Sequence, residues 1–195
     1  ASSGGLLEVG PHSAGAVPGP ACYGRGGTQA TVTDANVALG YLDPTNFLGG
    51  SDNLDMDAAH RALDELGMKL GVERLAASDG IFRVVNTQMA EGIRLATVRR
   101  GVDPRCFALI GFGGAAGLHV TSLARLLDLK RVVVPRVASV LSAWGMLTTD
   151  LRYEVTRTHV GEVGELPPEV ATRRLSDFQG VSGRRLVDLV ARHCT

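Results

Sequence analysis

The stretch from Phe107 to His119, which reads FALIGFGGAAGLH, constrains the fold of this chain most strongly. Its first half is a short apolar run whose length and flanks are typical of a buried strand. Gly113 and Gly114 follow at once, and apolar residues at helical spacing begin after Gly117. The pattern therefore predicts a strand, a glycine turn and a helix.

A strand–glycine–helix turn has two possible uses. It places unpaired backbone N–H groups and the positive end of a helix dipole beside the end of a strand, which suits a phosphate group. The alternative is a tight turn without a ligand, because short glycine patterns are common. The residues alone leave both open, with Gly113 and Gly114 as the first candidates for contact with a phosphate.

Composition places the chain among globular proteins. Its 195 residues suffice for one domain with a real core, and 45% of them are hydrophobic against 21% charged. The formal net charge of +0 argues against a nucleic-acid surface and against an anionic-membrane anchor. No apolar run reaches the length of a membrane span. Three widely spaced cysteines fit no zinc pattern and suit reduced thiols, so we expect a cytoplasmic protein.

Helical and strand periodicities alternate along the middle of the chain, after a glycine- and proline-rich first 30 residues. The helices expected are Thr33 to Gly40 with Thr33 as N-cap, Asp55 to Gly71, Ser78 to Arg99, Gly117 to Asp128 and Ser139 to Met146. The strands expected are Phe107 to Phe112, Arg131 to Val134 and Tyr153 to Val160. This alternation predicts an α/β layer, in which ligands bind at the carboxyl ends of strands. Gly113 and Gly114 follow one of those ends.

Four segments together carry a family resemblance. They read GPACYGRGGTQATVTDANVALG, NTQMAEGIRLATVRRGVDP, FALIGFGGAAGLH and SVLSAWGMLTTDLR. In this order and spacing the chain resembles the hydantoinase/oxoprolinase family, which includes A-type subunits of ATP-dependent hydantoinases, 5-oxoprolinase and the β subunit of acetone carboxylase. The resemblance covers roughly residues 1 to 160 and is more specific than any single glycine motif.

The resemblance implies part of an actin-like, sugar-kinase-like ATPase domain that binds ATP with magnesium. In that fold two glycine hairpins hold the phosphates, and a third turn between a strand and a helix packs against the nucleotide. Gly113, Gly114 and Ala115 match this third turn. The activity implied is hydrolysis of a cyclic amide, in which ATP activates the ring carbonyl and water then opens the ring. This chain would supply one wall of the nucleotide site.

The chain also departs from the family pattern. The two phosphate hairpins, each an acidic residue followed by Gly-Gly-Thr, do not occur in this sequence. We therefore expect a truncated piece with an ATPase-like part at residues 1–160 and a linker with a short helical tail at 161–195. The isolated chain should be inactive, expose an apolar patch, and need a missing N-terminal half or a partner subunit. Two alternatives stay open: a non-catalytic or partner-dependent fragment, and a β-type subunit of an ATP-dependent ketone carboxylase.

Three further residues are candidates for the site, each with a structural alternative. Asp34 is the candidate catalytic residue, since a carboxylate beside a glycine loop could hold magnesium or orient an attacking group, but it would also stabilise the start of a helix. Arg25 could bind a carboxylate or phosphate as a planar fork, or bond to loop carbonyls. His119 could lie near phosphate or be packed or capping. The thiol of Cys22 is expected to be buried or a spectator. We find no cluster with metal-ligand spacing in the sequence.

Overall fold

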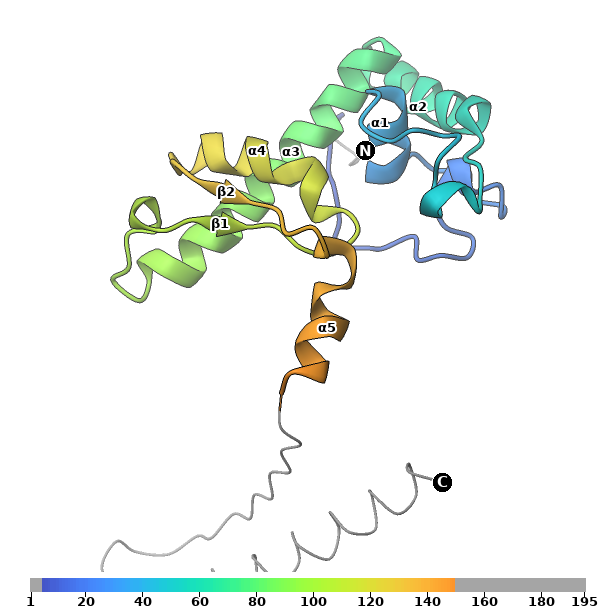
Figure 1. The fold of residues 1–195 in the computed structure, drawn as a ribbon. Coiled ribbons are helices and arrows are strands. Elements are labelled where there is room, and N and C mark those ends of the chain that lie inside the picture. Colours follow the sequence, from blue (N-terminus) through green and yellow to red (C-terminus); the bar gives the residue numbers. More distant parts are fainter. Residues whose placement is uncertain (1–4, 150–195) are drawn as a thin grey trace, which may run out of the picture. The chain divides into compact units, whose positions relative to one another are not determined.

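The computed structural model describes residues 5–149, which form mostly helices and one small parallel sheet (Figure 1). The α-helices are α1 (Val32–Ala38), α2 (Met56–Leu70), α3 (Arg74–Val98), α4 (Ala116–Leu126) and α5 (Leu141–Leu147). The strands are β1 (Leu109–Ile110) and β2 (Val132–Val133). Short 3-10 turns lie at Ala21–Tyr23, Leu48–Gly50, Pro104–Cys106 and Ala138–Val140. Among the residues described, we find no helix with the length and apolar character that a membrane span requires.

The chain divides into two compact units, Ala1–Ser142 and Ala143–Thr195. The first unit holds α1 to α4 and both strands, and it contains every site residue predicted from the sequence. The predicted strand from Tyr153 to Val160 lies outside the described residues, as does the predicted boundary after residue 160, so both stay predictions.

Helices α1, α2 and α3 pack against one another. α2 begins and ends as its sequence predicts, because the Asp55 carboxylate accepts a hydrogen bond from the N–H of Ala58 and Gly71 ends the helix in a left-handed conformation. The predicted cap of α1 is wrong by two residues. Thr31 is the N-cap, and its hydroxyl accepts a bond from the N–H of Asp34, whereas Thr33 lies within the helix.

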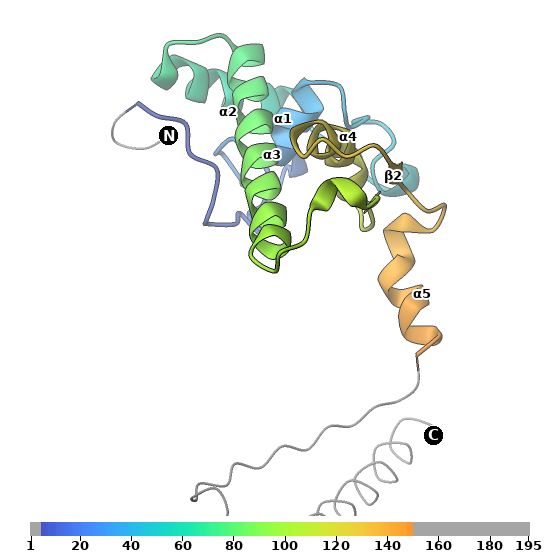
Figure 2. The same cartoon turned by 90° about the vertical axis from the view of Figure 1, so that its left-hand side faces the viewer.

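The long helix α3 packs against α1 and α2 on one side and against α4 on the other, and so connects them within the first unit (Figure 2). It begins at Arg74 rather than at Ser78, because the hydroxyl of Ser78 bonds back to the carbonyl of Arg74 and so sits within the helix. Near its start, Ile81 joins a core cluster with α1 and α2. Nine residues later, Ala90 joins a second cluster with α4 and the sheet. At 25 residues α3 is about 37 Å long, so one helix fixes both clusters.

The two strands pair in parallel, with Leu109 opposite Val132 and Ile110 opposite Val133. Leu109 packs into the cluster of α3 and α4, but Ile110 points away from it and is exposed. The sequence predicted a buried strand from Phe107 to Phe112. That prediction is wrong in extent and in burial, because within residues 5–142 helices pack against one face of the sheet and the other face stays open.

Candidate functional site

The turn between β1 and α4 has the predicted order of strand, glycines and helix. Gly113 adopts a left-handed conformation with a φ of 92°, which residues with a side chain rarely reach. Gly114 has no such φ, and a side chain built on it would meet open space. Gly111 is constrained differently, because a Cβ atom there would overlap the side chain of Val120 in α4. The special glycines are therefore Gly113, for conformation, and Gly111, for packing.

The backbone N–H groups of this turn fall into two kinds. The N–H of Gly113 donates to the carbonyl of Ala138 at 2.7 Å, so it is occupied within the chain. Among residues 5–149, the next four N–H groups, from Gly114 to Gly117, have no hydrogen-bond acceptor. Gly114, Ala115 and Gly117 are also exposed, and the N-cap Ala115 offers no side-chain cap. Four unpaired donors at the positive end of an 11-residue helix are suited to an anion.

His119 lies in the first turns of α4 and is buried between this helix and α3. Its Nδ1 lies 3.2 Å from Oδ1 of Asn86, whose amide nitrogen in turn donates to the carbonyl of Phe82. This network assigns the proton to Nδ1 of the imidazole. Burial lowers the pKa of His119, so the ring is neutral at pH 7. His119 is thus a packed residue that holds the start of α4 against α3, while a direct phosphate contact stays a prediction.

The rings of His119, Phe82 and Tyr41 contact one another in a row, which we call the aromatic ladder. The His119 ring stacks on Phe82 with centroids 5.2 Å apart, and Phe82 lies 4.9 Å from the ring of Tyr41 in the loop after α1. The first pair is stacked and the second is tilted, and aromatic pairs at these separations add about 0.5–1.5 kcal/mol per pair beyond burial. The position of the glycine turn is therefore coupled to the loop that follows α1.

Asp34 is fully buried and holds the glycine-rich loop onto the start of α1. Its Oδ1 accepts the N–H of Cys22 at 2.8 Å, and its Oδ2 accepts the N–H of Ala21 at 3.3 Å. Oδ2 also accepts the N–H and the hydroxyl of Thr31 at 2.8 and 2.7 Å. Four donors use the acceptor capacity of a carboxylate. This geometry supports the helix-start role in an extended form, and the catalytic role of Asp34 stays a prediction.

Arg25 lies on the same loop and is half-exposed. Its guanidinium stands 5.8 Å from the centre of the Tyr23 ring and 3.6 Å from the carboxylate of Asp52. Both partners come from the chain itself, and both are weak contacts for an exposed side chain. The guanidinium thus remains accessible to a carboxylate or a phosphate, which is the role that the sequence suggested.

Cys22 is buried, as the sequence favoured. It packs in a cluster with Val37, Leu54 and Ala59, and burial, followed by its bond to Asp34, raises the pKa of the thiol far above its usual value. A thiol held protonated is a poor nucleophile.

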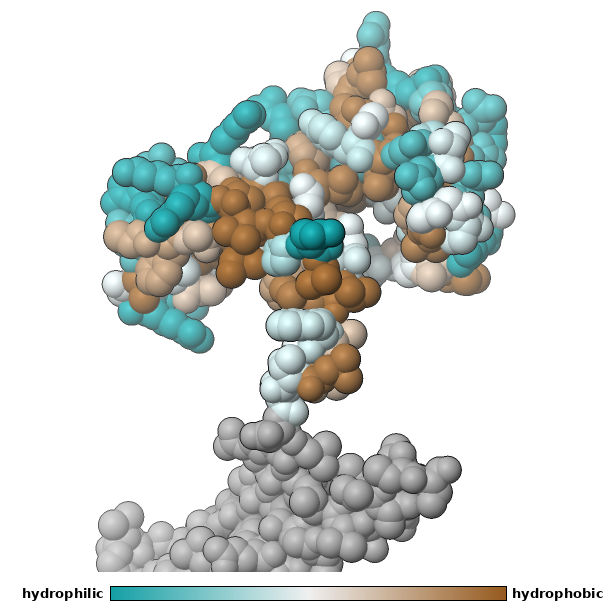
Figure 3. Space-filling view, in the orientation of Figure 1, coloured by the Kyte–Doolittle hydropathy of each residue, from teal (hydrophilic) through white to brown (hydrophobic). Residues whose placement is uncertain are grey.

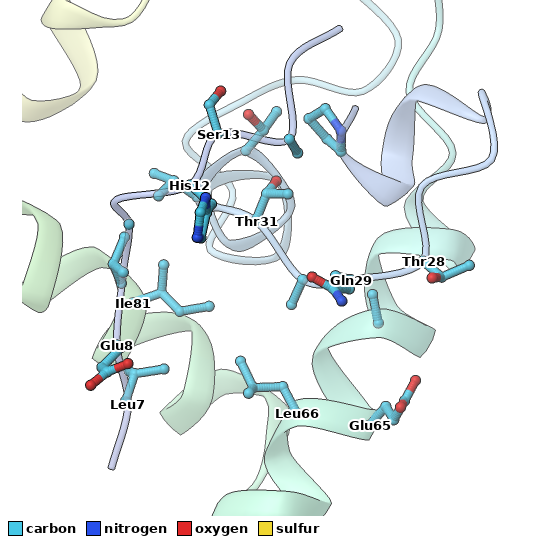
Figure 4. Close-up of a pocket in the computed structure, with 18 of the residues that line it drawn as sticks. Leu7, Glu8, His12, Ser13, Thr28, Gln29, Thr31, Glu65, Leu66 and Ile81 are labelled. Carbon is cyan, nitrogen blue, oxygen red and sulfur yellow. The ribbon is translucent and has the colours of Figure 1, made fainter. Parts of the chain in front are cut away.

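A pocket of about 840 Å³ lies beneath the N-terminal segment and the glycine-rich loop (Figure 4). Its apolar lining includes Ala30, Val32, Leu66 and Ile81, and its polar lining includes Glu8, His12, Gln29 and Thr31. The segment above it is tied down because the Gln88 amide donates to the carbonyl of Val9. The sequence carried no signal for this pocket, since its walls come from segments far apart in the chain. It shares no residue with the turn at Gly113.

The predicted site residues therefore form two groups. Asp34 and Arg25 belong to the glycine-rich loop and α1, whereas Gly113, Ala115 and His119 belong to the turn and α4. Within residues 5–149 no hydrogen bond, ion pair or ring contact joins the groups directly, and the ladder through Phe82 is the link between them. Asn86, the partner of His119, was missed, although it opens one of the segments that carried the family resemblance.

Together, the parallel strand pair and the glycine turn define an α/β protein with an exposed helix N-terminus at a strand end. The particular family follows from the sequence. The chain belongs to the hydantoinase/oxoprolinase family, whose sequence model matches residues 1–155.

Individual relatives agree with this assignment. The caprolactamase subunit alpha of Pseudomonas jessenii is 51% identical over 155 residues, which are 79% of this chain and 22% of that protein. The 5-oxoprolinase PfmaA of Pestalotiopsis fici is 42% identical over 163 residues, 77% of this chain and 12% of that protein. The crystal structure of the ATP-dependent caprolactamase from Pseudomonas jessenii aligns with a TM-score of 0.71 at 51% identity, over 78% of this chain and 22% of that one. The chain thus spans about a fifth or less of the length of these relatives.

Proposed function

We propose that this chain supplies one wall of the nucleotide site in a larger ATP-dependent enzyme that hydrolyses a cyclic amide. One observation carries the proposal: the four unpaired N–H groups from Gly114 to Gly117 at the start of α4. The segment that contains them lies within the part of the chain that matches the family model. The actin-like form of the whole ATPase domain belongs to this proposal.

The residues present suit the phosphates of ATP better than they suit magnesium. The N–H groups at the turn are anion donors, and the macrodipole of α4 adds positive potential there. Magnesium requires oxygen ligands, and the Asp34 carboxylate is already occupied by four donors. In the described part of the chain no group of three or more acidic, histidine or cysteine residues could hold a metal. We therefore propose that the oxygen ligands of magnesium come from the ATP phosphates and from the part of the larger enzyme outside this chain.

The cyclic amide follows from the relatives caprolactamase and 5-oxoprolinase. Caprolactam and 5-oxoproline are both lactams, so ATP would activate the ring carbonyl for attack by water. In such a reaction this chain's own task is to bind and orient phosphate oxygens, because phosphoryl transfer depends on positioning and on neutralising charge. His119 and Asn86 would serve by fixing the start of α4 against α3.

A second candidate is an ATP-dependent ketone carboxylase. An acetophenone carboxylase gamma subunit from Aromatoleum aromaticum is 41% identical over 161 residues. The same turn would then bind the same phosphates, and the substrate would differ. We favour the lactam because the caprolactamase subunit shares more of its residues with this chain.

Titration of the labelled chain with ATP and magnesium, followed by amide NMR, tests the nucleotide wall. We expect millimolar binding, with the largest shifts at Gly114 to Gly117. Gly114→Glu should abolish these shifts, because the new carboxylate repels phosphate and has open space to occupy. Gly92→Glu is the matched control, since Gly92 is an exposed glycine on α3 that also has open space. Shifts confined to other residues, or equal effects of both variants, would refute the proposed wall.

The isolated chain should not open 5-oxoproline or hydantoin with ATP and magnesium. The sequence contains neither acidic Gly-Gly-Thr hairpin, and the turn alone provides only part of a phosphate site. Turnover of about one per second or more would contradict the view that the chain is one part of the site.

A further inference from the structure

The outer face of the small sheet, on the side away from α4, exposes apolar side chains. In a parallel sheet such a face is normally covered. Leu109 and Gly111 face α4, so Ile110 and Phe112 face the opposite side, because side chains alternate along a strand. Ile110 is 55% exposed and Phe112 is 51% exposed. Val133, the register partner of Ile110, is 46% exposed. Figure 3 shows apolar residues gathered over β1 and β2.

The segments that follow the two strands also carry exposed apolar residues. The bond from the N–H of Gly113 to the carbonyl of Ala138 holds those segments together. Val137, next to Ala138, is exposed, and so is Val140. We call the surface formed by Ile110, Phe112 and Val133 the open sheet face.

Two physical reasons indicate that the open sheet face is an interface. Parallel sheets occur almost only with both faces covered, because their connections carry helices over them. A sheet of two strands is also too small to be stable by itself, and in the described part of the chain each strand has a single neighbour. Apolar patches of this kind on soluble proteins mark contact surfaces.

We propose that the open sheet face is covered by the polypeptide that supplies the rest of the family's sequence, through an apolar surface with an acidic rim. Two observations identify this occupant. The chain corresponds to 22% of the caprolactamase alpha subunit, so most of such a protein lies outside it. The exposed Arg131 and Arg136 flank β2 on either side, so a second copy packed face to face would bring like charges together, whereas acidic residues would pair with them.

The proposal rests on the proposed function only in taking this chain as one part of a larger enzyme. It requires neither nucleotide binding nor a particular substrate. A measurement of folding therefore separates a failure of this interface from a failure of the nucleotide wall.

The test compares one substitution in two contexts: the isolated chain, and a chimera in which this chain replaces the matching segment of the Pseudomonas jessenii caprolactamase alpha subunit. Ile110→Glu should change the melting temperature of the isolated chain by less than about 2 °C, because the side chain is exposed there. In the chimera it should lower the melting temperature by several degrees or remove the protein from the soluble fraction, because a buried, unpaired charge is costly. Val133→Glu should repeat the pattern.

Met68→Glu is the control, since Met68 is 76% exposed on α2, which does not contact the sheet. It should have little effect in either context. An Ile110→Glu chimera that is as stable as the unsubstituted chimera would overturn the proposal. An unsubstituted chimera that does not fold would also overturn it, because a segment that is 51% identical and carries this face should dock onto the rest of the subunit. A concentration-dependent dimer of the isolated chain that Ile110→Glu abolishes would assign the face to a second copy instead.

Discussion

Replacing Asp34 by Asn tests whether this carboxylate does more than start a helix. Thr31 is the N-cap of α1 and Asp34 is the third residue of the helix, so a carboxylate that only favoured the helix start by its charge should lose less than about 1 kcal/mol on this change. In the structure the two oxygens of Asp34 accept four hydrogen bonds, three of them from backbone N–H groups of Ala21, Cys22 and Thr31. An amide group presents N–H donors in place of one oxygen. At least one of those backbone donors must therefore lose its acceptor.

The magnitude follows from that geometry. Placing the amide nitrogen at Oδ1 costs the least, since one donor, the N–H of Cys22, is then left unpaired. A buried donor without a partner costs about 1–3 kcal/mol. The remaining bonds at Oδ2 also weaken, because bonds to an ionised acceptor are roughly twice as strong as neutral ones. We expect Asp34→Asn to lower the free energy of unfolding by about 2–4 kcal/mol, a large fraction of the total for a domain of this size.

The measurement is urea unfolding of the chain followed by circular dichroism, with linear extrapolation to water. Asp55→Asn is the matched control, because Asp55 caps α2 through a single bond to the N–H of Ala58. That variant should lose less than about 0.5 kcal/mol. If Asp34→Asn also stays within about 0.5 kcal/mol of the unsubstituted chain, the described hydrogen bonds do not hold the loop and the structural role argued for Asp34 is refuted.

Three further outcomes can be measured on the isolated chain. Gly113→Ala should cost about 1–2 kcal/mol of unfolding free energy, because its φ of 92° is strained for alanine, whereas Gly114→Ala should cost less than about 0.5 kcal/mol; equal costs would contradict the assigned turn. Burial lowers the pKa of His119, so below about pH 6.5 the unfolded chain binds a proton at this ring that the folded chain does not, and stability should fall as the pH drops. His119→Gln should reduce this loss of stability between about pH 7.5 and 5.5. An unchanged pH dependence in the variant would contradict the assignment of the loss to His119. In a thiol-labelling experiment on the native chain, the buried Cys22 should remain unmodified while the exposed Cys106 reacts; rapid labelling at Cys22 would show that its cluster opens readily.

Much of the local structure could be predicted because its signals are local. The Asp55 cap and the terminal Gly71 define α2 from residues next to the helix ends, and the structure confirms both. The family resemblance, carried by four segments in order, is confirmed by the match over residues 1–155. The order of strand, glycine turn and helix around Gly113 is also as predicted, since a change of periodicity at two glycines permits few other conformations.

One error was local and the other was tertiary. Thr31 and Thr33 both precede Asp34 closely, and the reciprocal bonds between Thr31 and Asp34, three residues apart, make Thr31 the cap. Phe107 to Phe112 looked like a buried strand because apolarity along the chain does not say whether both faces are covered. Helix α3 packs on one face through its cluster at Ala90, and that packing is a tertiary property.

The sequence by itself determined the family, the order of the main elements and the presence of a glycine turn before α4, because these depend on residue types and on spacings within one segment. The tertiary structure alone decided which residues meet across segments. It bound Asp34 to a loop 12 and 13 residues earlier, paired His119 with Asn86 33 residues away, and left Ile110 exposed. The physical reason is that burial, hydrogen-bond satisfaction and stacking are properties of pairs in space, whereas a sequence pattern reports on one element at a time.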